Sequence, residues 1–431
     1  MTAGETARLR ACPRCRPYQT PHQVLRHREL VCRGVQLILS GALNSGTEGE
    51  LGALLGVSAR HLRRLFLVHL GTTPDQLARL HRAQRACRLL DYTALSVTEI
   101  ASAAGYGSLR QFNRSFRQAF RFSPSQLRAH RRSTGQLAIA GGVPLRLPYH
   151  GLLDWTALTR CLAAQAVPGV ERVSTCCYRR TVVVGGDPGV LELRPGGSGY
   201  LVLVAHAQHW EELVHIVGRA RQIASLDEDP DAAACFLAGD QVIGPLVTAR
   251  PGVRVPGCWD PFEVGVRAII ERHEPDAAAS TQRLVRRIGR QVPWLAQFGL
   301  THCFPPAQAI AAAGPAELAG LGLGNSAATA IVTFAEAVAS KQLAFDRSAG
   351  LDQLIATLTA ISGLDSHCAH YIALRAGEPD ACPGADLAVK RSVSMRGAPG
   401  PTKALSGNWR PWRALAATHL WLDDQSAAAT G

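Results

Sequence analysis

The sequence predicts a multidomain, mainly α-helical protein with three domains in order. The N-terminal third repeats one pattern twice, a short helix, a glycine turn and a basic helix, which is typical of a double helix-turn-helix. The middle of the chain carries short runs rich in β-branched residues, which predict a small α+β domain. The last part is a series of helical segments with short connections, which predicts an all-α domain. With 431 residues and 47% hydrophobic content, the chain can give each domain its own core.

The first helix-turn-helix begins with a short helix over residues 50–58, which runs into a glycine and the capping residue Ser58. In the helix that follows, apolar side chains fall on one face and basic side chains on the other. The inward set is Leu62, Leu65 and Phe66, and the outward set is Arg60, His61, Arg63 and Arg64. We expect the outward set to contact operator DNA.

The second copy follows the turn at Gly105–Ser108, and a helical run over residues 76–90 bridges the two. Four apolar residues recur at helical spacing and form one face: Leu109, Phe112, Phe116 and Phe120. The opposite side offers groups that pair with base edges in the major groove: Ser108, Arg110, Gln111, Asn113 and Arg114. The alternative is a solvated basic helix packed on a core.

Charge is segregated in the same way. Residues 1–132 carry 21 Arg, no Lys and 7 acidic residues, a net charge of +14. The remaining 299 residues carry 25 basic and 26 acidic side chains. The basic excess therefore belongs to the N-terminal third, as expected for a module that binds phosphates by counterion release.

These two motifs and the closing Ser123-Pro124 with Arg128 resemble the AraC-type bipartite DNA-binding domain, over residues 30–132. Two positions depart from that family's pattern, Arg121 in place of Gly and Leu127 in place of an aromatic residue. The resemblance implies a sequence-specific transcription regulator that binds a promoter site.

A Cys-x-x-Cys pair, Cys12 and Cys15, lies between arginines near the N-terminus. Residues 1–25 resemble the end of an Ada-type zinc and methyl-acceptor domain, whose further cysteines lie upstream. Only Met1–Ala11 precede the pair, so we expect the acceptor cysteine to be absent, either because the domain was lost or because the true start lies upstream. Because two thiolates leave a tetrahedral zinc half-coordinated, we expect no bound metal and no cofactor.

Residues 133–144 are polar and then glycine-rich, which predicts a linker. Beyond it, strands are predicted over 178–184, 190–193 and 200–204, and helices over 155–164 and 210–223. Residues 145–148, 166–171 and 178–181 resemble the N-terminal domain of AlkA-type DNA glycosylases. The resemblance implies a TATA-binding-protein-like α+β domain over residues 145–250.

Helices are predicted over 260–272, 277–288, 305–312, 315–319, 325–340, 351–361, 368–376 and 412–422. Residues 259–270 resemble the opening helix of the helix-hairpin-helix glycosylase fold, and residues 358–375 resemble its hairpin and second helix. Residues 380–390 resemble the loop that bears the family's catalytic aspartate, and residues 408–421 its closing helix. The resemblance implies an all-α glycosylase domain over residues 255–425.

By this correspondence Asp386 is the catalytic residue, and the alternative is an N-cap of the helix that begins at Leu387. A glycosylase flips the target base into a pocket, and a carboxylate stabilises the sugar cation as the glycosidic bond breaks. Tyr371 and Trp421 offer electron-rich faces for a cationic alkylated purine. His367 stands where the family has a pocket Trp.

The DNA-facing edge departs from the family. The hairpin reads Gly363-Leu364-Asp365 in place of Gly-hydrophobic-Gly, so a carboxylate stands where a phosphate should bind. Asp365 can adopt the left-handed turn geometry, but its charge opposes the ligand. The family's Gln-rich loop, which fills the gap left by the flipped base, is here residues 271–276. We expect the lesion-bearing DNA to contact Gly363, Asp365, Arg272 and His273.

The sequence thus predicts a fusion of an AraC-type domain with an AlkA-like DNA-3-methyladenine glycosylase that excises alkylated purines. The alternative is a transcription regulator whose glycosylase module is weakened or inactive. Double-stranded DNA is the expected partner of both modules. No apolar run reaches the ~18 residues of a membrane span, so we expect a cytoplasmic, nucleoid-associated protein with no membrane contact.

Overall fold

The computed structural model describes residues 21–92, 95–120, 122–128, 142–207, 209–345, 350–384, 386–397 and 406–430. Cys12 and Cys15 lie outside the described residues, as do Arg121 and most of the predicted linker. The chain divides into two compact units, residues up to 134 with 210–214, and the remainder. No helix in the described ranges is long and apolar enough to span a membrane.

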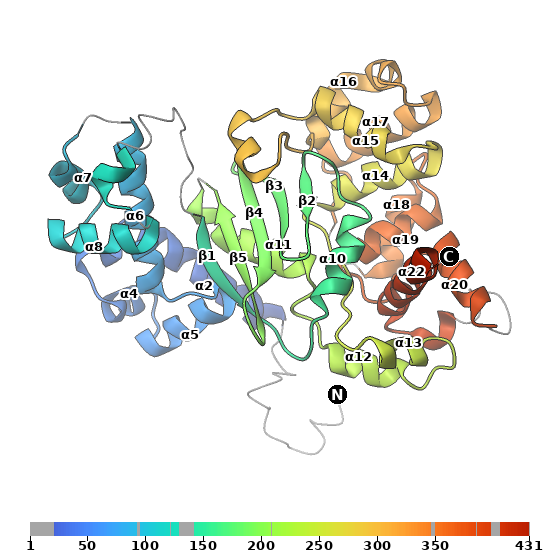
Figure 1. Ribbon diagram of the computed structural model, residues 1–431, viewed down its shortest axis with the longest axis horizontal. Coiled ribbons are helices and arrows are strands. Elements are labelled where there is room, and N and C mark those ends of the chain that lie inside the picture. The colour runs from blue at the N-terminus through green and yellow to red at the C-terminus, as the bar shows by residue number, and fades with distance from the viewer. Residues whose placement is uncertain are drawn as a thin grey trace. The chain divides into compact units, whose positions relative to one another are not determined.

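The first unit is helical (Figure 1). Its helices are α2 (Pro21–Leu39), α3 (Ala42–Ser45), α4 (Glu48–Leu54), α5 (Ala59–Leu70), α6 (Pro74–Tyr92), α7 (Val97–Ala103) and α8 (Leu109–Phe120). Pairs α4–α5 and α7–α8 are the two predicted helix-turn-helix motifs, and α6 is the predicted bridge.

Capping side chains fix where these helices begin. Thr47 and Ser96 form capping boxes with Glu50 and Glu99, and the Ser58 hydroxyl accepts the His61 amide at 3.2 Å. The turn glycines Gly56 and Gly105 have φ of +69° and +85°, a conformation that favours glycine.

The apolar face of α8 is narrower than predicted. Phe112 and Phe116 are fully buried, but Leu109 is 42% exposed because it lies at the first helical position. The side chain of Phe120 lies outside the described residues. The first short helix begins at Glu48, since Thr47 caps it before the predicted start.

The second unit contains an antiparallel sheet with the order β1-β5-β4-β3-β2 within the described residues. Its strands are β1 (Val143–Pro148), β2 (Glu171–Val173), β3 (Tyr178–Val184), β4 (Asp187–Pro195) and β5 (Tyr200–His206). Burial alternates along β5, with Leu201, Leu203 and Ala205 buried. One face of the sheet is therefore covered, and Figure 1 shows helices α14 to α22 on one side of it.

The three central strands were predicted, and the two edge strands were not. β1 contains Pro144 and Pro148, and proline in a sequence argues against a strand. An edge strand nevertheless accepts proline, because one of its sides forms no ladder of hydrogen bonds. β1 begins at Val143, so the last two residues of the predicted linker, 143 and 144, belong to a strand. β2 has three residues, too few for a periodic signal.

The helices of this unit mostly match their predicted ranges. They are α10 (Trp155–Ala163), α11 (Leu213–Ile223), α12 (Pro230–Leu237), α13 (Gly244–Ala249), α14 (Pro261–His273), α15 (Ala277–Ile288), α16 (Ala307–Gly320), α17 (Asn325–Ala339), α18 (Leu351–Thr359), α19 (Ser366–Arg375), α20 (Leu387–Met395) and α22 (Arg413–Thr430). Short 3-10 turns are η2 (Pro293–Phe298) and η4 (Ser406–Trp409), and a third, η1 (Trp210–Glu212), is grouped with the first unit. The predicted helix over 210–223 is therefore interrupted, and α16 keeps the predicted break because Gly314 has a φ of +73°.

A buried ion cluster joins the sheet to α14. Arg180 on β3 is 2% exposed and contacts Glu263 on α14 at 2.5 Å and Glu171 on β2 at 3.6 Å. The Tyr178 hydroxyl donates to Glu171 at 2.6 Å, and Arg267 on α14 lies 3.9 Å from the same carboxylate. Because buried charges require partners, these contacts fix the distance between sheet and helix.

Burial and pairing act in opposite directions on the two acids. Burial raises the pKa of Glu263 to about 7, even though Arg180 lowers it. Burial also acts to raise the pKa of Glu171, but Arg180 and Arg267 hold it below its usual range. The cation is therefore needed to keep either carboxylate in the interior.

Replacing Arg180 with Met should destabilise the protein by about 3–5 kcal/mol, because the buried Glu263 loses its cation and Glu171 keeps only the more distant Arg267. Chemical denaturation followed by tryptophan fluorescence measures the change. Arg179→Met is the matched control, since it removes a pair with Glu192 that lies nearer the surface and should cost less than about 1 kcal/mol. Equal losses in both variants would contradict a special role for the buried cluster.

Candidate functional site

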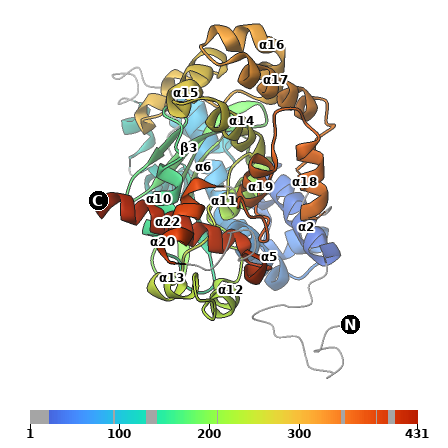
Figure 2. The ribbon, with the colours of Figure 1, turned by 90° about the vertical axis from the view of Figure 1, so that its right-hand side faces the viewer.

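A cleft of about 800 Å³ opens in the unit that contains the sheet. Its walls come from the second half of α14, from α19, from the first half of α20, from α22, and from the end of α10 with the segment after it. Figure 2 shows α14, α19, α20 and α22 together on one side of the unit. A volume of this size is within the range of small-molecule sites and accepts a nucleobase with its sugar.

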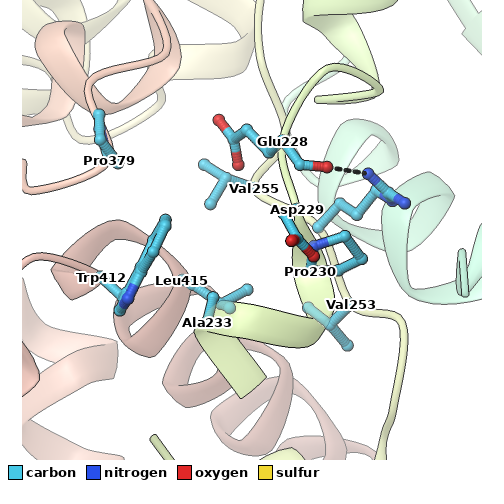
Figure 3. Close-up of a pocket in the computed structure, with 10 residues that line it drawn as sticks. Glu228, Asp229, Pro230, Ala233, Val253, Val255, Pro379, Trp412 and Leu415 are labelled. Atoms are coloured by element: carbon cyan, nitrogen blue, oxygen red, sulfur yellow. Dashed lines mark hydrogen bonds between the residues drawn. The ribbon is translucent and has the colours of Figure 1, made fainter. Parts of the chain in front are cut away.

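A second cavity, of about 20 Å³, lies beside α12 and is shown in Figure 3. Glu228, Trp412 and Leu415 are among the residues that line it, and Arg254 donates to the Glu228 carbonyl at 3.3 Å. The space is about that of one water molecule, so this cavity is not a substrate site.

Asp386 lies on the wall of the large cleft and caps α20. Its Oδ1 accepts the amides of Ala388 at 2.8 Å and Val389 at 3.0 Å, so the N-cap alternative is confirmed as geometry. Its Oδ2 has no hydrogen-bond partner among the described residues. The cap fixes the carboxylate while one oxygen stays available to the cleft.

The helix that Asp386 caps is itself fixed to α22. Arg391 pairs with Asp424 through two contacts of 2.7 and 2.8 Å, and Arg396 pairs with Asp423 through contacts of 2.7 and 3.0 Å. Two-point pairs of this kind fix the orientation as well as the distance. Since α22 also carries Trp421, the aspartate and the aromatic ring keep a constant relation.

The predicted aromatic residues meet in the cleft. The rings of Tyr371 and Trp421 are edge to face, with centroids 6.1 Å apart, and Tyr371 is 6% exposed. His367, the predicted substitute for a pocket Trp, also lines the cleft, and its Nδ1 is buried with no partner in the described part of the chain. The structure therefore brings together Asp386, Tyr371, Trp421 and His367.

The hairpin differs from the prediction. The left-handed residue is Gly363, with φ of +92°, where an added Cβ would lie 2.2 Å from that of Ala330. Asp365 is extended and is the N-cap of α19: its Oδ1 accepts the Cys368 amide at 2.8 Å, and its Oδ2 accepts from Arg272 Nε at 3.1 Å. Asp365 therefore does not use the left-handed geometry that an aspartate can adopt.

The charge of Asp365 is also compensated. Partial burial acts to raise its pKa, but the Cys368 amide and the Arg272 guanidinium hold that pKa below its usual range. Arg272 and Asp365 both line the cleft, and Gly363 and His273 do not. The predicted loop over 271–276 is shorter than expected, because its first three residues form the last turn of α14.

Comparison with known proteins agrees with this architecture. Residues 51–130 match a helix-turn-helix domain, residues 144–260 the AlkA N-terminal domain, and residues 275–408 the HhH-GPD superfamily base excision DNA repair protein. The fold is also that of the 3-methyladenine DNA-glycosylase from Archaeoglobus fulgidus, with a TM-score of 0.57 and 22% identity over 65% of this chain and 98% of that chain.

Two curated relatives align over most of their length. "DNA-3-methyladenine glycosylase 2" of Escherichia coli is 30% identical over 62% of this chain and 93% of its own. "Probable bifunctional transcriptional activator/DNA repair enzyme AlkA" of Mycobacterium tuberculosis is 34% identical over 97% of this chain and 86% of its own. The chain belongs to the AlkA family. It is a DNA glycosylase joined to an AraC-type helix-turn-helix domain, and DNA is its partner.

The cleft of this AlkA-family chain also contains polar residues that sequence reasoning missed: Gln165, Glu271, Arg375 and Lys390. Enclosure in the cleft raises the pKa of Glu271, which Arg267 and Arg375 act to lower. Arg375 is 5% exposed, and its NH2 donates to the Gly257 carbonyl at 2.9 Å. Arg375 ends the predicted hairpin helix, but nothing local indicates that it reaches the cleft.

In the helix-turn-helix unit, three predicted DNA contacts, Arg63, Arg64 and His61, interact with other residues of the protein. Arg63 pairs with Glu48 at 2.7 Å, and Arg64 lies 2.9 Å from His61 Nδ1. Partial burial, Arg64 and His27 lower the pKa of His61, so the ring accepts this contact in its neutral form. Arg60 is exposed on the same helix.

The second recognition helix keeps more of its polar side chains available. Ser108 and Gln111 cap the start of this helix. The Ser108 Oγ accepts a hydrogen bond from the Gln111 amide at 3.2 Å, and the Gln111 Oε1 accepts one from the Gly107 amide at 3.2 Å. Arg110 and Arg114 are exposed, and Asn113 is partly exposed, with no hydrogen bond or ion pair to the described residues. Arg128, the arginine of the closing signature, donates to the Leu95 carbonyl at 2.7 Å and therefore holds two parts of this unit together.

Among the described residues, no group of three or more His, Cys, Asp or Glu side chains is arranged to hold a metal ion. The cysteines in these ranges are free thiols, and burial raises the pKa of the two that line the cleft, Cys161 to about 11 and Cys368 to about 12. These thiols are therefore in the protonated form at neutral pH.

Replacing Arg272 with Gln should weaken binding of duplex DNA and lower the slope of log affinity against log salt by about 1, if its guanidinium contacts one phosphate. Titration at several salt concentrations measures both. Arg287→Gln is the matched control, because Arg287 forms a similarly exposed pair, with Glu317 at 3.2 Å, on α15 and outside the cleft. The same salt slope in the wild-type protein, Arg272→Gln and Arg287→Gln would show that Arg272 does not contact a phosphate.

Proposed function

We propose that the chain removes alkylated purines such as 3-methyladenine from duplex DNA, with Asp386 as the catalytic carboxylate. The supporting observation is the position of Asp386, which is fixed by its own helix cap with one oxygen free in a cleft that two aromatic rings wall. The base would be flipped out of the duplex and would lie against Tyr371, Trp421 and His367.

The proposed chemistry needs no cofactor. A purine alkylated on a ring nitrogen carries positive charge, which the faces of Tyr371 and Trp421 attract. As the glycosidic bond lengthens, the sugar becomes cationic, and the ionised Asp386 stabilises it. The base takes the electron pair of the glycosidic bond and leaves as a neutral molecule, so no strong general acid is needed. Water then forms the new bond to the sugar and releases its proton to solvent.

At the mouth of the cleft we propose contacts from the DNA to Gly363, Asp365, Arg272 and His273. The ion pair between Arg272 and Asp365 supports this, because it neutralises the carboxylate that would otherwise repel a phosphate. The remaining guanidinium donors of Arg272 are exposed and suited to a phosphate.

Asp386→Asn should abolish release of 3-methyladenine and leave DNA affinity within about twofold. The amide keeps the shape and the capping oxygen, but it removes the charge that stabilises the sugar cation. Chromatography of the bases released from methylated DNA measures the loss. Asp229→Asn, which makes the same change at the N-cap of α12 outside the cleft, is the control and should keep the wild-type rate of release. Release at the wild-type rate by Asp386→Asn would contradict the catalytic role, and no release by the wild-type protein would favour the regulator-only alternative.

For the N-terminal unit we propose sequence-specific binding to a promoter, read by α5 and α8. The proposed contacts are Arg60, His61, Arg63, Arg64, Ser108, Arg110, Gln111, Asn113 and Arg114. Arg110 and Asn113 are the best supported as readers of bases, since both lie in the first turns of α8 and neither is bound within the described protein.

Replacing Arg110 or Asn113 with Ala should reduce the difference in binding free energy between cognate and unrelated DNA by about 1–3 kcal/mol. Competition binding of the full chain to the two sequences measures this difference. Arg117→Ala, an exposed arginine later on α8, is the control and should weaken both sequences alike. If Arg110→Ala lowers the affinity for both sequences equally, Arg110 contacts a phosphate and does not read a base.

A further inference from the structure

A closed hydrogen-bond triangle forms part of the cleft wall. Gln165 Oε1 accepts from the Tyr371 hydroxyl and from NH1 of Arg375. The same NH1 donates to the Tyr371 hydroxyl at 3.0 Å. Tyr371 and Arg375 are 6% and 5% exposed, so the triangle is set in the protein interior beside the cleft.

The triangle determines which way the Gln165 amide points. A guanidinium only donates, so the atom that contacts it must be the amide oxygen. The NH2 group then lies on the other side of the amide, and it has no partner among the described residues. Since Gln165 lines the same cleft as Asp386, two N–H donors are available to a molecule bound there.

We infer that Gln165 is a specificity-determining residue that donates a hydrogen bond to a carbonyl oxygen of the flipped base. This inference rests on the proposed function. Guanine bears an oxygen at position 6 and adenine an amino group, so the donor favours 7-methylguanine over 3-methyladenine. The rings of Tyr371 and Trp421 do not make this distinction, because every base has a π-face.

The neighbouring charge acts in the same direction. The Arg375 guanidinium lies 5.9 Å from the centre of the Tyr371 ring and is anchored to the Gly257 carbonyl. A fixed cation beside the pocket attracts a carbonyl oxygen and repels an amino group. A site built to donate also rejects the base that leaves its donor unpaired.

Gln165→Glu tests the inference with little change of shape. One carboxylate oxygen keeps accepting from Tyr371 and Arg375, and the other replaces the NH2 donor with an acceptor. The substrate is methylated duplex DNA that contains both 7-methylguanine and 3-methyladenine, and both released bases are measured in one reaction. The ratio of their release rates, 7-methylguanine to 3-methyladenine, should fall about tenfold or more.

Gln425→Glu is the matched control, since it makes the same chemical change elsewhere on the cleft, on α22. It should leave the ratio unchanged. If Gln165→Glu fails to fold, Tyr371→Phe provides a second test, because loss of the hydroxyl removes one of the two donors that orient the amide, and the ratio should again fall. A general loss of stability would lower both rates together and would not move the ratio.

An unchanged ratio in both Gln165→Glu and Tyr371→Phe, with both bases still released, would overturn the inference and leave the proposed function standing. Release of neither base by the wild-type protein would instead count against the proposed function itself. A ratio that falls equally in Gln425→Glu would also overturn the inference, because the added charge and not the lost donor would then be the cause.

Discussion

The cleft depends on one buried guanidinium, that of Arg180. It lies on the sheet and contacts carboxylates from β2 and α14, so it sets how far the sheet stands from the helices. None of the strands lines the cleft, but Gln165 lies six residues before Glu171 and α14 carries Glu271 and Arg272, so the ion cluster positions both of these parts of its wall. Without Arg180, Glu263 would be buried with no cation and Glu171 would keep only Arg267, 3.9 Å away.

Two aspartates of the glycosylase unit show how one local motif serves two purposes. Asp386 and Asp365 both cap helices, although the sequence indicated the N-cap only for Asp386. Asp386 uses one oxygen for its cap and keeps the other in the cleft, whereas Asp365 uses one for its cap and the other for Arg272. The difference lies in the presence of a cation 93 residues away in the chain, which no local pattern indicates.

In the helix-turn-helix unit, basic side chains divide between structure and recognition. Arg82 is buried, donates to the Leu43 carbonyl at 2.8 Å and lies 5.7 Å from the centre of the Tyr106 ring, so it connects α3 to the turn of the second motif. Glu48 contacts Arg63 and also accepts the Asp75 amide at 3.2 Å. The charge segregation of the sequence therefore overstates the number of arginines that face DNA.

The sequence alone determined the helix-turn-helix pairs, the central strands, most helices and the position of Asp386. Each of these has a local cause, such as apolar spacing, a capping residue or a turn glycine. Such a cause involves only residues about one or two helical turns apart in the chain. The range of β3 and that of α15 were predicted to the residue for this reason. Tertiary structure alone decided the edge strands β1 and β2, the pairing of Asp365 with Arg272, and the triangle of Gln165, Tyr371 and Arg375. Gln165 meets its two partners across 206 and 210 residues, and such a contact exists only when the sheet and the helices have packed.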